Sequence, residues 1–362
     1  MLLSVYMSNE RNAMADLFKN TMNAMPNKKS IILIIPSAYS RSEFSKNFCA
    51  VINEDISESN NKREQIFRYY KFIKQVKRLQ KIYNINHIFF ESDMSRLCIL
   101  FKFFIRNVKF SFCLHDPILH EGTSSVGYVE RYFFNIVFPR CCHKIILTYA
   151  EAFDILHKNW FYRGLDSKFR YFRLPQMPEL EYKELKDRNE DIKYDFLFFG
   201  RIEKYKGLDI LTQVFKSDEM KKFKLLVVGR GRDEVHVQTL CSGAKNIKFI
   251  NEYVSNFELA SYIKQSKFVV LPYKSATGSQ TVQIANYYGK MVIATEVGCF
   301  KEYIVEGKNG FFIKNFSYEG IKKSLLYFSK INLEKYKQSI QQEYKKFNIN
   351  DFSEQLYNEI AK

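Results

Sequence analysis

The stretch that decides the fold runs from Lys267 to Phe312 and reads KFVVLPYKSATGSQTVQIANYYGKMVIATEVGCFKEYIVEGKNGFF. Its first segment, 268–271, is wholly apolar and stops at Pro272, which is typical of a strand buried on both faces of a parallel sheet. A polar turn over 274–281 follows, and apolar residues at helical spacing then continue to Gly289. The stretch therefore predicts a strand, a loop and a helix in succession.

Two more buried strands are expected at 291–295 and 311–313, which completes a strand–helix–strand unit of a parallel sheet. The loop 274–281 then lies at the carboxyl end of one strand and at the start of a helix. Unpaired backbone N–H groups and the helix dipole favour an anion at such a place. Phosphate is the usual occupant.

A second loop of the same kind lies upstream. The apolar run 194–199 leads into Gly200 and Arg201, and Lys206 and Gly207 precede a helical pattern. Two cations that leave one turn at the end of a strand can hold another face of the same phosphate. The alternative is a pair of surface cations, which the flanking glycines of a tight turn make less attractive.

These segments resemble the C-terminal half of the retaining glycosyltransferases of family 4, the group 1 glycosyltransferases with the GT-B fold, of the kind found in bacterial surface-polysaccharide biosynthesis. The residues that carry the resemblance are Phe199-Gly200-Arg201 with Lys206-Gly207, the run 225–231, and the run 272–298 with Glu302. The resemblance covers about half of the chain, in order and at plausible spacings.

The resemblance implies an α/β protein of GT-B architecture, in which two Rossmann-like domains face each other across a cleft and a C-terminal helix returns to the N-terminal domain. The length of 362 residues also favours two domains. We expect an acceptor-binding domain at 1–172, a linker at 173–193, a nucleotide-sugar-binding domain at 194–340, and the returning helix within 341–362.

Apolar runs alternate with amphipathic stretches in the N-terminal half as well, which favours a second parallel sheet with crossover helices. We expect strands at 30–35, 87–90, 108–114 and 144–148, helices at 10–25, 62–83, 94–106, 126–138 and 150–160, and a last helix at 351–361.

The strand 108–114 delivers His115 and Asp116 to its carboxyl end, with His120 and Glu121 close behind. For an arbitrary His-Asp pair, side chains that only cap turns are the more common explanation. The resemblance changes this expectation, because family members have a histidine at this place that faces the donor sugar.

By resemblance, the catalytic residues are His115, Asp116, Arg201 and Lys206, and the acceptor-binding residues are His120 and Glu121. The expected donor-binding residues are Gly200, Arg201, Lys206, Gly229, Thr277, Gly278, Ser279, Gln280, Thr281 and Gln283.

The chemistry of a retaining transfer explains these residue types. The sugar–phosphate bond breaks with oxocarbenium-like character, and positive groups must stabilise the charge that grows on the leaving diphosphate. No Asp-x-Asp motif occurs, so we expect neither a metal nor another cofactor. Family members usually carry two glutamates in the last loop, where this chain has Ala276 and Ile284, so other polar side chains of the loop must replace them.

The charge balance indicates an anionic partner. The chain has 56 Lys and Arg against 39 Asp and Glu, a net charge of +17. Eight of these cations lie between Lys62 and Lys81, interleaved with apolar residues. Such a helix is either a solvated face over a core stripe or a patch for anionic lipid headgroups.

The remaining features indicate a cytoplasmic protein that is peripheral at the inner face of the plasma membrane. We find no signal peptide, no apolar run long enough to span a membrane, and seven scattered cysteines without metal-ligand or disulfide spacing.

The sequence thus favours a retaining, metal-independent glycosyltransferase that moves a sugar from a nucleotide sugar to a glycan, on a polyprenyl-diphosphate lipid, for an O-antigen or capsule-like polysaccharide. One alternative is a non-catalytic GT-B module that binds a nucleotide sugar or a polyanion. Nucleic-acid binding rests on the net charge alone, without a recognition motif, and a GT-B epimerase lacks a matching set of acids and bases.

Overall fold

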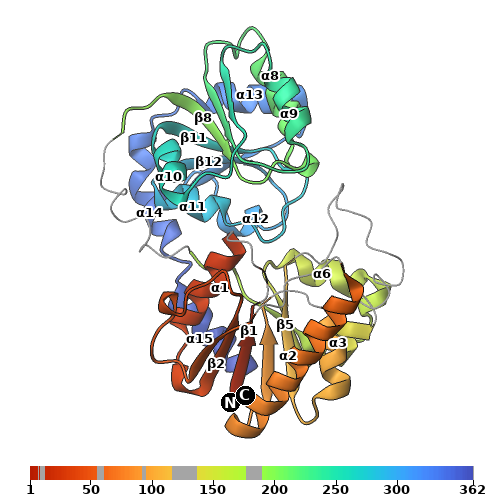
Figure 1. Cartoon of the computed structure of the whole chain (residues 1–362). Helices are drawn as coiled ribbons and strands as arrows, with labels where there is room; N and C mark the ends of the chain where they lie inside the picture. The colour runs from red at the N-terminus through yellow and green to blue at the C-terminus, as the bar shows by residue number, and fades with distance from the viewer. Residues whose placement is uncertain are drawn as a thin grey trace. The chain divides into compact units, whose positions relative to one another are not determined.

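The structure is a computed structural model that describes residues 1–6, 8, 13–54, 61–91, 95–115, 137–176 and 190–361. These residues form two compact units (Figure 1). Unit 1 contains the described residues of 1–115 and 137–175 together with 348–361, and unit 2 contains the described residues of 176–347. Each unit is a parallel sheet with helices, so the expected α/β class with two Rossmann-like domains is confirmed.

Unit 1 is built on a seven-stranded sheet in the order β3-β2-β1-β4-β5-β6-β7, in which every described pairing is parallel. The strands are β1 (Leu2–Val5), β2 (Ile31–Ile35), β3 (Ala50–Asn53), β4 (His87–Phe90), β5 (Lys109–Leu114), β6 (Lys144–Leu147) and β7 (Phe169–Tyr171). The central strand β1 was not expected, and neither were β3 and β7.

The helices of unit 1 are α1 (Ala13–Ala24), α2 (Lys62–Tyr83), α3 (Ser95–Phe104), α5 (Phe138–Cys141), α6 (Glu151–Lys158) and α15 (Ile349–Ile360). Most of the helix expected at 126–138 lies outside the described residues. The last helix, α15, packs on α1 in unit 1: Ser353 Oγ donates to the Thr21 carbonyl at 3.1 Å, and Phe352, Leu356 and Ile360 join the core around Phe18 and Met22.

The chain enters unit 1 for the last time at Asn348, later than the expected boundary at 341. The helix α14 (Lys337–Tyr344) stays in unit 2, because Tyr344 packs on Tyr287 and Phe347 packs on Tyr303.

Unit 2 is built on a six-stranded parallel sheet in the order β10-β9-β8-β11-β12-β13. The strands are β8 (Tyr194–Phe199), β9 (Leu225–Val228), β10 (Ile247–Ile250), β11 (Ser266–Leu271), β12 (Met291–Thr295) and β13 (Gly310–Ile313). The helices besides α14 are α8 (Leu208–Phe215), α9 (Glu234–Cys241), α10 (Asn256–Lys264), α11 (Thr281–Tyr287), α12 (Phe300–Tyr303) and α13 (Tyr318–Phe328).

The strand–helix–strand unit predicted from Lys267 to Phe312 is confirmed as β11, α11 and β12. Val269 and Val270 are fully buried and pair in register with Val292 and Ile293 of β12. The helix ends before Gly289, which has a φ of 70° that favours glycine.

The strand order of unit 2 reverses its direction between β8 and β11. In open α/β sheets, ligands bind outside the carboxyl ends of the strands at such a switch point. The loops that follow β8 and β11 are the two loops that the sequence singled out.

Candidate functional site

Lys206 lies at the end of the short 3₁₀ helix Lys204–Lys206 that follows β8, and it is only 7% exposed. Its Nζ donates a hydrogen bond to the hydroxyl of Tyr273 at 3.0 Å and lies 4.7 Å from the centroid of the Tyr273 ring. Tyr273 follows β11 and is also buried. The pair therefore joins the two loops at the switch point, and the sequence analysis did not single out its tyrosine.

The buried ammonium of Lys206 has no carboxylate partner among the described residues. Burial, and then the charge of Arg201, lower its pKa to about 7 from an ordinary 10.5. Arg201 itself is exposed at the same turn. Burial raises the pKa of Tyr273, so that its hydroxyl stays neutral. Glu203, before the same turn, raises the pKa to a smaller extent but forms no ion pair with Lys206 among the described contacts. A buried cation beside a second cation favours an anionic ligand.

The backbone holds the two loops against each other. The N–H of Lys274 donates to the carbonyl of Tyr205 at 2.6 Å. At Gly207, which has a φ of 69°, an added Cβ would lie 2.0 Å from the carbonyl oxygen of Pro272. Only glycine permits this approach of the loop after β8 to the end of β11.

The neighbouring loops are tied in a similar way. The N–H of Gly200 donates to the carbonyl of Val228 at 3.1 Å, which places Gly200 beside Gly229. The N–H of Cys299, after β12, donates to the carbonyl of Ala276 at 3.1 Å. Gly200 and Gly229, two of the three expected donor-binding glycines, thus lie on hydrogen-bonded loops.

A chain of polar side chains continues from Tyr273 into the loop before α11. The side chain of Thr281 forms a hydrogen bond with Tyr273, and its Oγ1 lies 2.9 Å from Oγ of Ser279. Lys206, Tyr273, Thr281 and Ser279 therefore form one connected cluster. The structure brings together these three expected donor-binding residues and links them through the unexpected tyrosine.

Four other expected donor-binding residues are close in sequence to Ser279 and Thr281 of this cluster. Thr277 and Gly278 are half-buried, whereas Gln280 and Gln283 are buried. Neither amide atom of Gln283 has a hydrogen-bond partner among the described residues. Such a group is unfavourable by about 1 to 3 kcal/mol unless a ligand or a water satisfies it.

The two positions where the sequence lacks glutamates do not offer polar side chains. Ala276 is buried, and its carbonyl accepts the hydrogen bond from Cys299. Ile284 is half-buried in α11. Polar groups near these positions that can make alternative contacts include the hydroxyl groups of Ser279 and Thr281 and the unsatisfied amide of Gln283.

In unit 1, His115 lies directly after β5 and is one of the expected catalytic residues. Its Nε2 lies 3.1 Å from the backbone carbonyl of Glu91 and 3.9 Å from the Glu91 carboxylate, and its Nδ1 lies 3.9 Å from Sγ of Cys113. Glu91 follows β4, is 3% exposed, and was not expected from the sequence. Asp116, His120 and Glu121 lie outside the described residues.

Among the residues that the structure describes, Glu91, Cys113 and His115 form a group that could hold a metal, because they offer ligand atoms within 4.8 Å of one another. The imidazole directs one nitrogen toward Glu91 and the other toward Cys113.

The comparison with protein families concerns unit 2. Residues 182–346 match the family model described as glycosyl transferases group 1. A protein of 41.2 kDa from the cps region of Klebsiella pneumoniae is 29% identical over 121 residues, 33% of this chain and 33% of the relative.

Two further curated relatives are similar over part of the chain. An uncharacterized glycosyltransferase of Methanocaldococcus jannaschii is 26% identical over 205 residues, 55% of this chain and 52% of its own length. The GDP-mannose:glycolipid 4-beta-D-mannosyltransferase of Xanthomonas campestris is 31% identical over 101 residues, 27% of this chain and 29% of its own length. The alignments therefore span about a third to a half of these relatives.

Solved structures resemble the whole chain. Anabaena HepE, in complex with UDP and glucose, has a TM-score of 0.71 at 12% identity, with 99% of each chain covered. WaaG, a glycosyltransferase of lipopolysaccharide biosynthesis, has a TM-score of 0.67 at 12% identity, with 100% of each chain covered. At these identities the likeness shows a shared fold.

Proposed function

We propose that this chain is a group 1 glycosyl transferase of the GT-B fold, and that it moves a sugar from a nucleotide-sugar donor to a glycan acceptor with retention of configuration and without a metal. The match of residues 182–346 to the family model supports this proposal. The observation that carries the proposal is the buried ammonium of Lys206, which lies beside Arg201 and lacks a carboxylate partner among the described residues. A diphosphate is the anion that such a pair would bind.

In the proposed mechanism, Lys206 and Arg201 stabilise the negative charge of the leaving group. As the bond between the sugar and the phosphate oxygen breaks, negative charge grows on the diphosphate, and Lys206 and Arg201 stabilise it. The hydroxyl of Tyr273 keeps Lys206 in place through the hydrogen bond of 3.0 Å. The acceptor hydroxyl attacks the anomeric carbon on the face that the leaving group vacates, and its proton passes to a phosphate oxygen.

His115 belongs to this proposal as the residue that contacts the donor sugar, which its place after β5 supports. Asp116 is proposed as a second catalytic residue, and His120 and Glu121 as acceptor contacts, by family resemblance alone. The donor is proposed to carry UDP or GDP, since HepE binds UDP and glucose and the Xanthomonas relative uses GDP-mannose.

The test uses UDP-glucose, UDP-GlcNAc and GDP-mannose in the presence of a chelator. Thermal protection and slow hydrolysis of the donor are measured for the wild type, for Arg201→Ala and for Lys206→Met. Lys204→Met is the matched control, because Lys204 is exposed on the same turn. We expect one of the donors to raise the melting temperature of the wild type and of Lys204→Met. Only these two proteins should hydrolyse that donor.

Other outcomes of this test are informative. Binding without hydrolysis or transfer would favour the non-catalytic binding module. Activity that the chelator abolishes would contradict the metal-independent mechanism. Absence of binding by every nucleotide sugar would remove the main support for a transferase.

The acceptor is proposed to be a lipid-linked glycan of a surface polysaccharide, such as an O-antigen or a capsule. The relative from a cps region and the relative that glycosylates a glycolipid support this choice. No described helix of the chain is long and apolar enough to cross a membrane.

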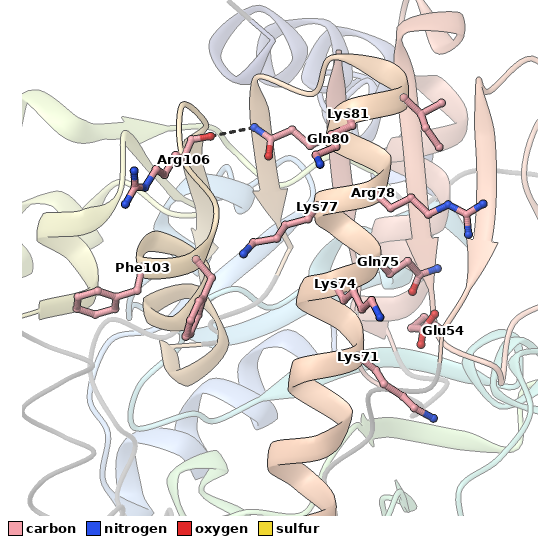
Figure 2. A pocket seen from close by; sticks show the side chains of 12 residues that line it. Glu54, Lys71, Lys74, Gln75, Lys77, Arg78, Gln80, Lys81, Phe103 and Arg106 are labelled. Atoms are coloured by element: carbon pink, nitrogen blue, oxygen red, sulfur yellow. Dashed lines mark hydrogen bonds between the residues drawn. The ribbon is translucent and has the colours of Figure 1, made fainter.

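We propose that the exposed face of α2 and α3 contacts anionic lipid at the inner surface of the plasma membrane. Lys71, Lys74 and Lys77 of α2 and Phe103 of α3 are among the residues that line one pocket. Figure 2 shows Lys77 directed toward α3, Lys71 on the opposite side of α2, and the ring of Phe103 directed away from α2. Phe103 is 74% exposed, and Nζ of Lys77 lies 5.6 Å from the centroid of the Phe104 ring. Exposed cations with aromatic rings between them are typical of peripheral membrane helices.

The alternative of a solvated face over a core stripe explains only part of α2. Val76 and Leu79 are buried as a core stripe requires, but Ile66 is 68% exposed and Tyr70 is 62% exposed. Apolar side chains thus lie on the solvent face together with the cations. This distribution favours a lipid surface over a purely solvated face.

Sedimentation with phosphatidylglycerol vesicles and with neutral phosphatidylcholine vesicles tests the lipid contact. We expect the wild type to bind the anionic vesicles, and Lys71→Glu, Lys74→Glu and Lys77→Glu together to abolish binding. Lys222→Glu, Lys224→Glu and Lys245→Glu, which line a basic groove of unit 2, change the net charge equally and should leave binding intact. Equal loss in both triple variants would contradict a specific surface.

A further inference from the structure

The neighbouring strands β4 and β5 of unit 1 end in side chains of types that bind metals. The two strands pair in parallel register up to Phe90 and Phe112. The next residues, Glu91 and Cys113, therefore lie beside each other. His115 follows Cys113 by two residues, and the alternation of an extended chain places both side chains on one face. The three side chains thus meet at the carboxyl ends of β4 and β5, where open α/β sheets bind their ligands.

The contacts of His115 orient one of its ring nitrogens as a metal ligand. Its Nε2 lies 3.1 Å from the backbone carbonyl of Glu91, and because a carbonyl oxygen can only accept, Nε2 carries the hydrogen. In the neutral ring Nδ1 then has a lone pair, and it faces Sγ of Cys113 at 3.9 Å. Histidines that bind metals usually donate their second ring nitrogen to a carbonyl or a carboxylate in this way.

The separation of the sulfur and the nitrogen is close to that in a zinc site. Tetrahedral Zn²⁺, with bonds of about 2.3 Å to sulfur and about 2.1 Å to nitrogen, separates two such ligand atoms by about 3.6 Å. The 3.9 Å between Sγ of Cys113 and Nδ1 of His115 is only slightly longer. A ligand atom of Glu91 lies within 4.8 Å of the ligand atoms of the other two, so a shift of roughly 1 Å would bring it into the same shell.

The carboxyl group of Glu91 indicates independently that a ligand binds here. Glu91 is 3% exposed, and its Oε2 has no hydrogen-bond partner among the described residues. Its Oε1 lies 3.9 Å from Nε2 of His115, which is too far for a hydrogen bond. A buried carboxyl oxygen without a partner is unfavourable, and a cation that binds it removes this cost.

We propose that Glu91, Cys113 and His115 bind one Zn²⁺ ion and leave its fourth position open. Thiolate and imidazole ligands favour Zn²⁺ over Mg²⁺ and Ca²⁺, which prefer oxygen ligands alone. Cys113 binds as the thiolate, and its proton passes to solvent. The ion takes no part in the proposed transfer chemistry. Only its effect on transfer rests on the proposed function, because an ion on Nδ1 keeps His115 from the donor sugar and so inhibits the enzyme.

Metal binding can be observed without any substrate. Full-length protein is treated with a chelator, desalted, and titrated with Co²⁺, which accepts the same ligands as Zn²⁺. A thiolate bound to Co²⁺ gives a charge-transfer band in the near ultraviolet. We expect this band to saturate at one Co²⁺ per chain, and we expect Zn²⁺, but not an excess of Mg²⁺, to abolish it. Zn²⁺ should also raise the melting temperature.

Substitution of the ligands decides whether this site holds the ion. Cys113→Ser should abolish the band and weaken Zn²⁺ binding by at least about 100-fold. Glu91→Gln keeps the shape but not the charge and should weaken binding by at least about tenfold. Cys142→Ser is the matched control and should behave as the wild type does, because Cys142 is another buried cysteine of unit 1, at 4% exposure, and is followed by His143. If circular dichroism shows that Cys113→Ser does not fold, His115→Gln takes its place.

Three results would overturn the proposal. The first is that the wild type binds neither Co²⁺ nor Zn²⁺. The second is a band that persists in Cys113→Ser or disappears in Cys142→Ser. The third is an affinity for Zn²⁺ that is the same in Glu91→Gln as in the wild type.

The effect on transfer is measured separately, as the ratio of the activity with Zn²⁺ to the activity with chelator. At a Zn²⁺ concentration of about ten times the Kd, this ratio should be about one tenth in the wild type and close to one in Cys113→Ser. If no donor binds the wild type, the transferase function fails while the cobalt spectrum still decides the metal site. If Zn²⁺ binds without lowering the activity, the inhibitory role of the site is wrong.

Discussion

At Lys206, burial and the charge of Arg201 lower the pKa of the ammonium to about 7, so that near neutral pH a substantial fraction of the apo protein lacks this charge. A bound diphosphate favours the charged form and raises the pKa. Binding of UDP or GDP above pH 7 should therefore take up as much as about one proton, and the affinity should fall by up to about tenfold per pH unit. Calorimetry in two buffers of different ionisation enthalpy measures this uptake.

The matched pair of lysines on one turn provides the control. In Lys206→Met the proton uptake should vanish and the affinity should become insensitive to pH, whereas the exposed Lys204→Met should behave as the wild type does. Proton uptake that survives in Lys206→Met would assign it to another group.

Gly298 allows a close approach between its own backbone and that of Ala276, which leads to a testable prediction. It has a φ of 48°, and an added Cβ would lie 1.6 Å from the carbonyl oxygen of Ala276. Because neither group is the flexible end of a side chain, Gly298→Ala should lower the free energy of unfolding by about 2 to 4 kcal/mol and weaken nucleotide binding. Gly243 has a φ of 77° with nothing near its Cβ position, so Gly243→Ala should cost only about 1 kcal/mol. Urea denaturation of both variants checks the difference.

The raised pKa of Glu91 leads us to expect that the stability of unit 1 depends on pH. Its pKa is about 8 in the folded protein against an ordinary value of 4.5, so the folded state retains a proton that the unfolded state has lost. The stabilisation is complete below about pH 4.5 and disappears as the pH rises through about 8. Over this pH range, the free energy of unfolding of the wild type should fall by about 2 to 5 kcal/mol relative to that of Glu91→Gln. Parallel pH-dependent curves of the two proteins would contradict the raised pKa.

Sequence patterns found some of these residues and missed others for physical reasons. Arg201 and Lys206 could be found because they flank glycines after a buried strand. Tyr273 and Glu91 could not, because their roles depend on side-chain contacts between segments that are distant in sequence. The lowered pKa of Lys206 is likewise a property of burial that no spacing shows.

At the scale of elements, the packing of α15 leads us to expect that the stability of unit 1 depends on this helix. Leu356 is 1% exposed in the core that α15 shares with α1, and Glu359 accepts a hydrogen bond from Arg170 at 3.0 Å. Leu356→Ala should therefore lower the free energy of unfolding by about 2 to 5 kcal/mol. The exposed Gln355→Ala should change stability by less than about 0.5 kcal/mol. Chemical denaturation followed by circular dichroism measures both, and similar values for the two would contradict a packed α15.

The elements that sequence patterns predicted best are those with long apolar runs between clear stops, such as β11, α11 and β12. The strands β1, β3 and β7 were missed because each has three or four residues and the packing of neighbouring strands, rather than its own pattern, stabilises it. Short strands of this kind are decided by tertiary contacts.

At the scale of the whole molecule, the net charge of +17 and the local surface of α2 and α3 make different predictions. A general positive charge attracts any polyanion, including nucleic acid, and salt screens this attraction. A surface that also inserts aromatic rings retains part of its affinity at high salt, because burial of apolar area does not depend on screening. The two cases can be separated by one salt titration.

We expect binding to phosphatidylglycerol vesicles to fall by about tenfold, but not to vanish, between about 0.1 M and about 0.5 M salt, while binding to single-stranded DNA falls below detection. Phe103→Ser removes a ring that is 74% exposed and should abolish the salt-resistant part of vesicle binding. Tyr253→Ser, which removes a ring of unit 2 that is 71% exposed, is the control and should leave it unchanged. If vesicle and DNA binding fall together with salt and Phe103→Ser has no effect, the attraction comes from net charge, and the membrane contact of α2 and α3 is wrong.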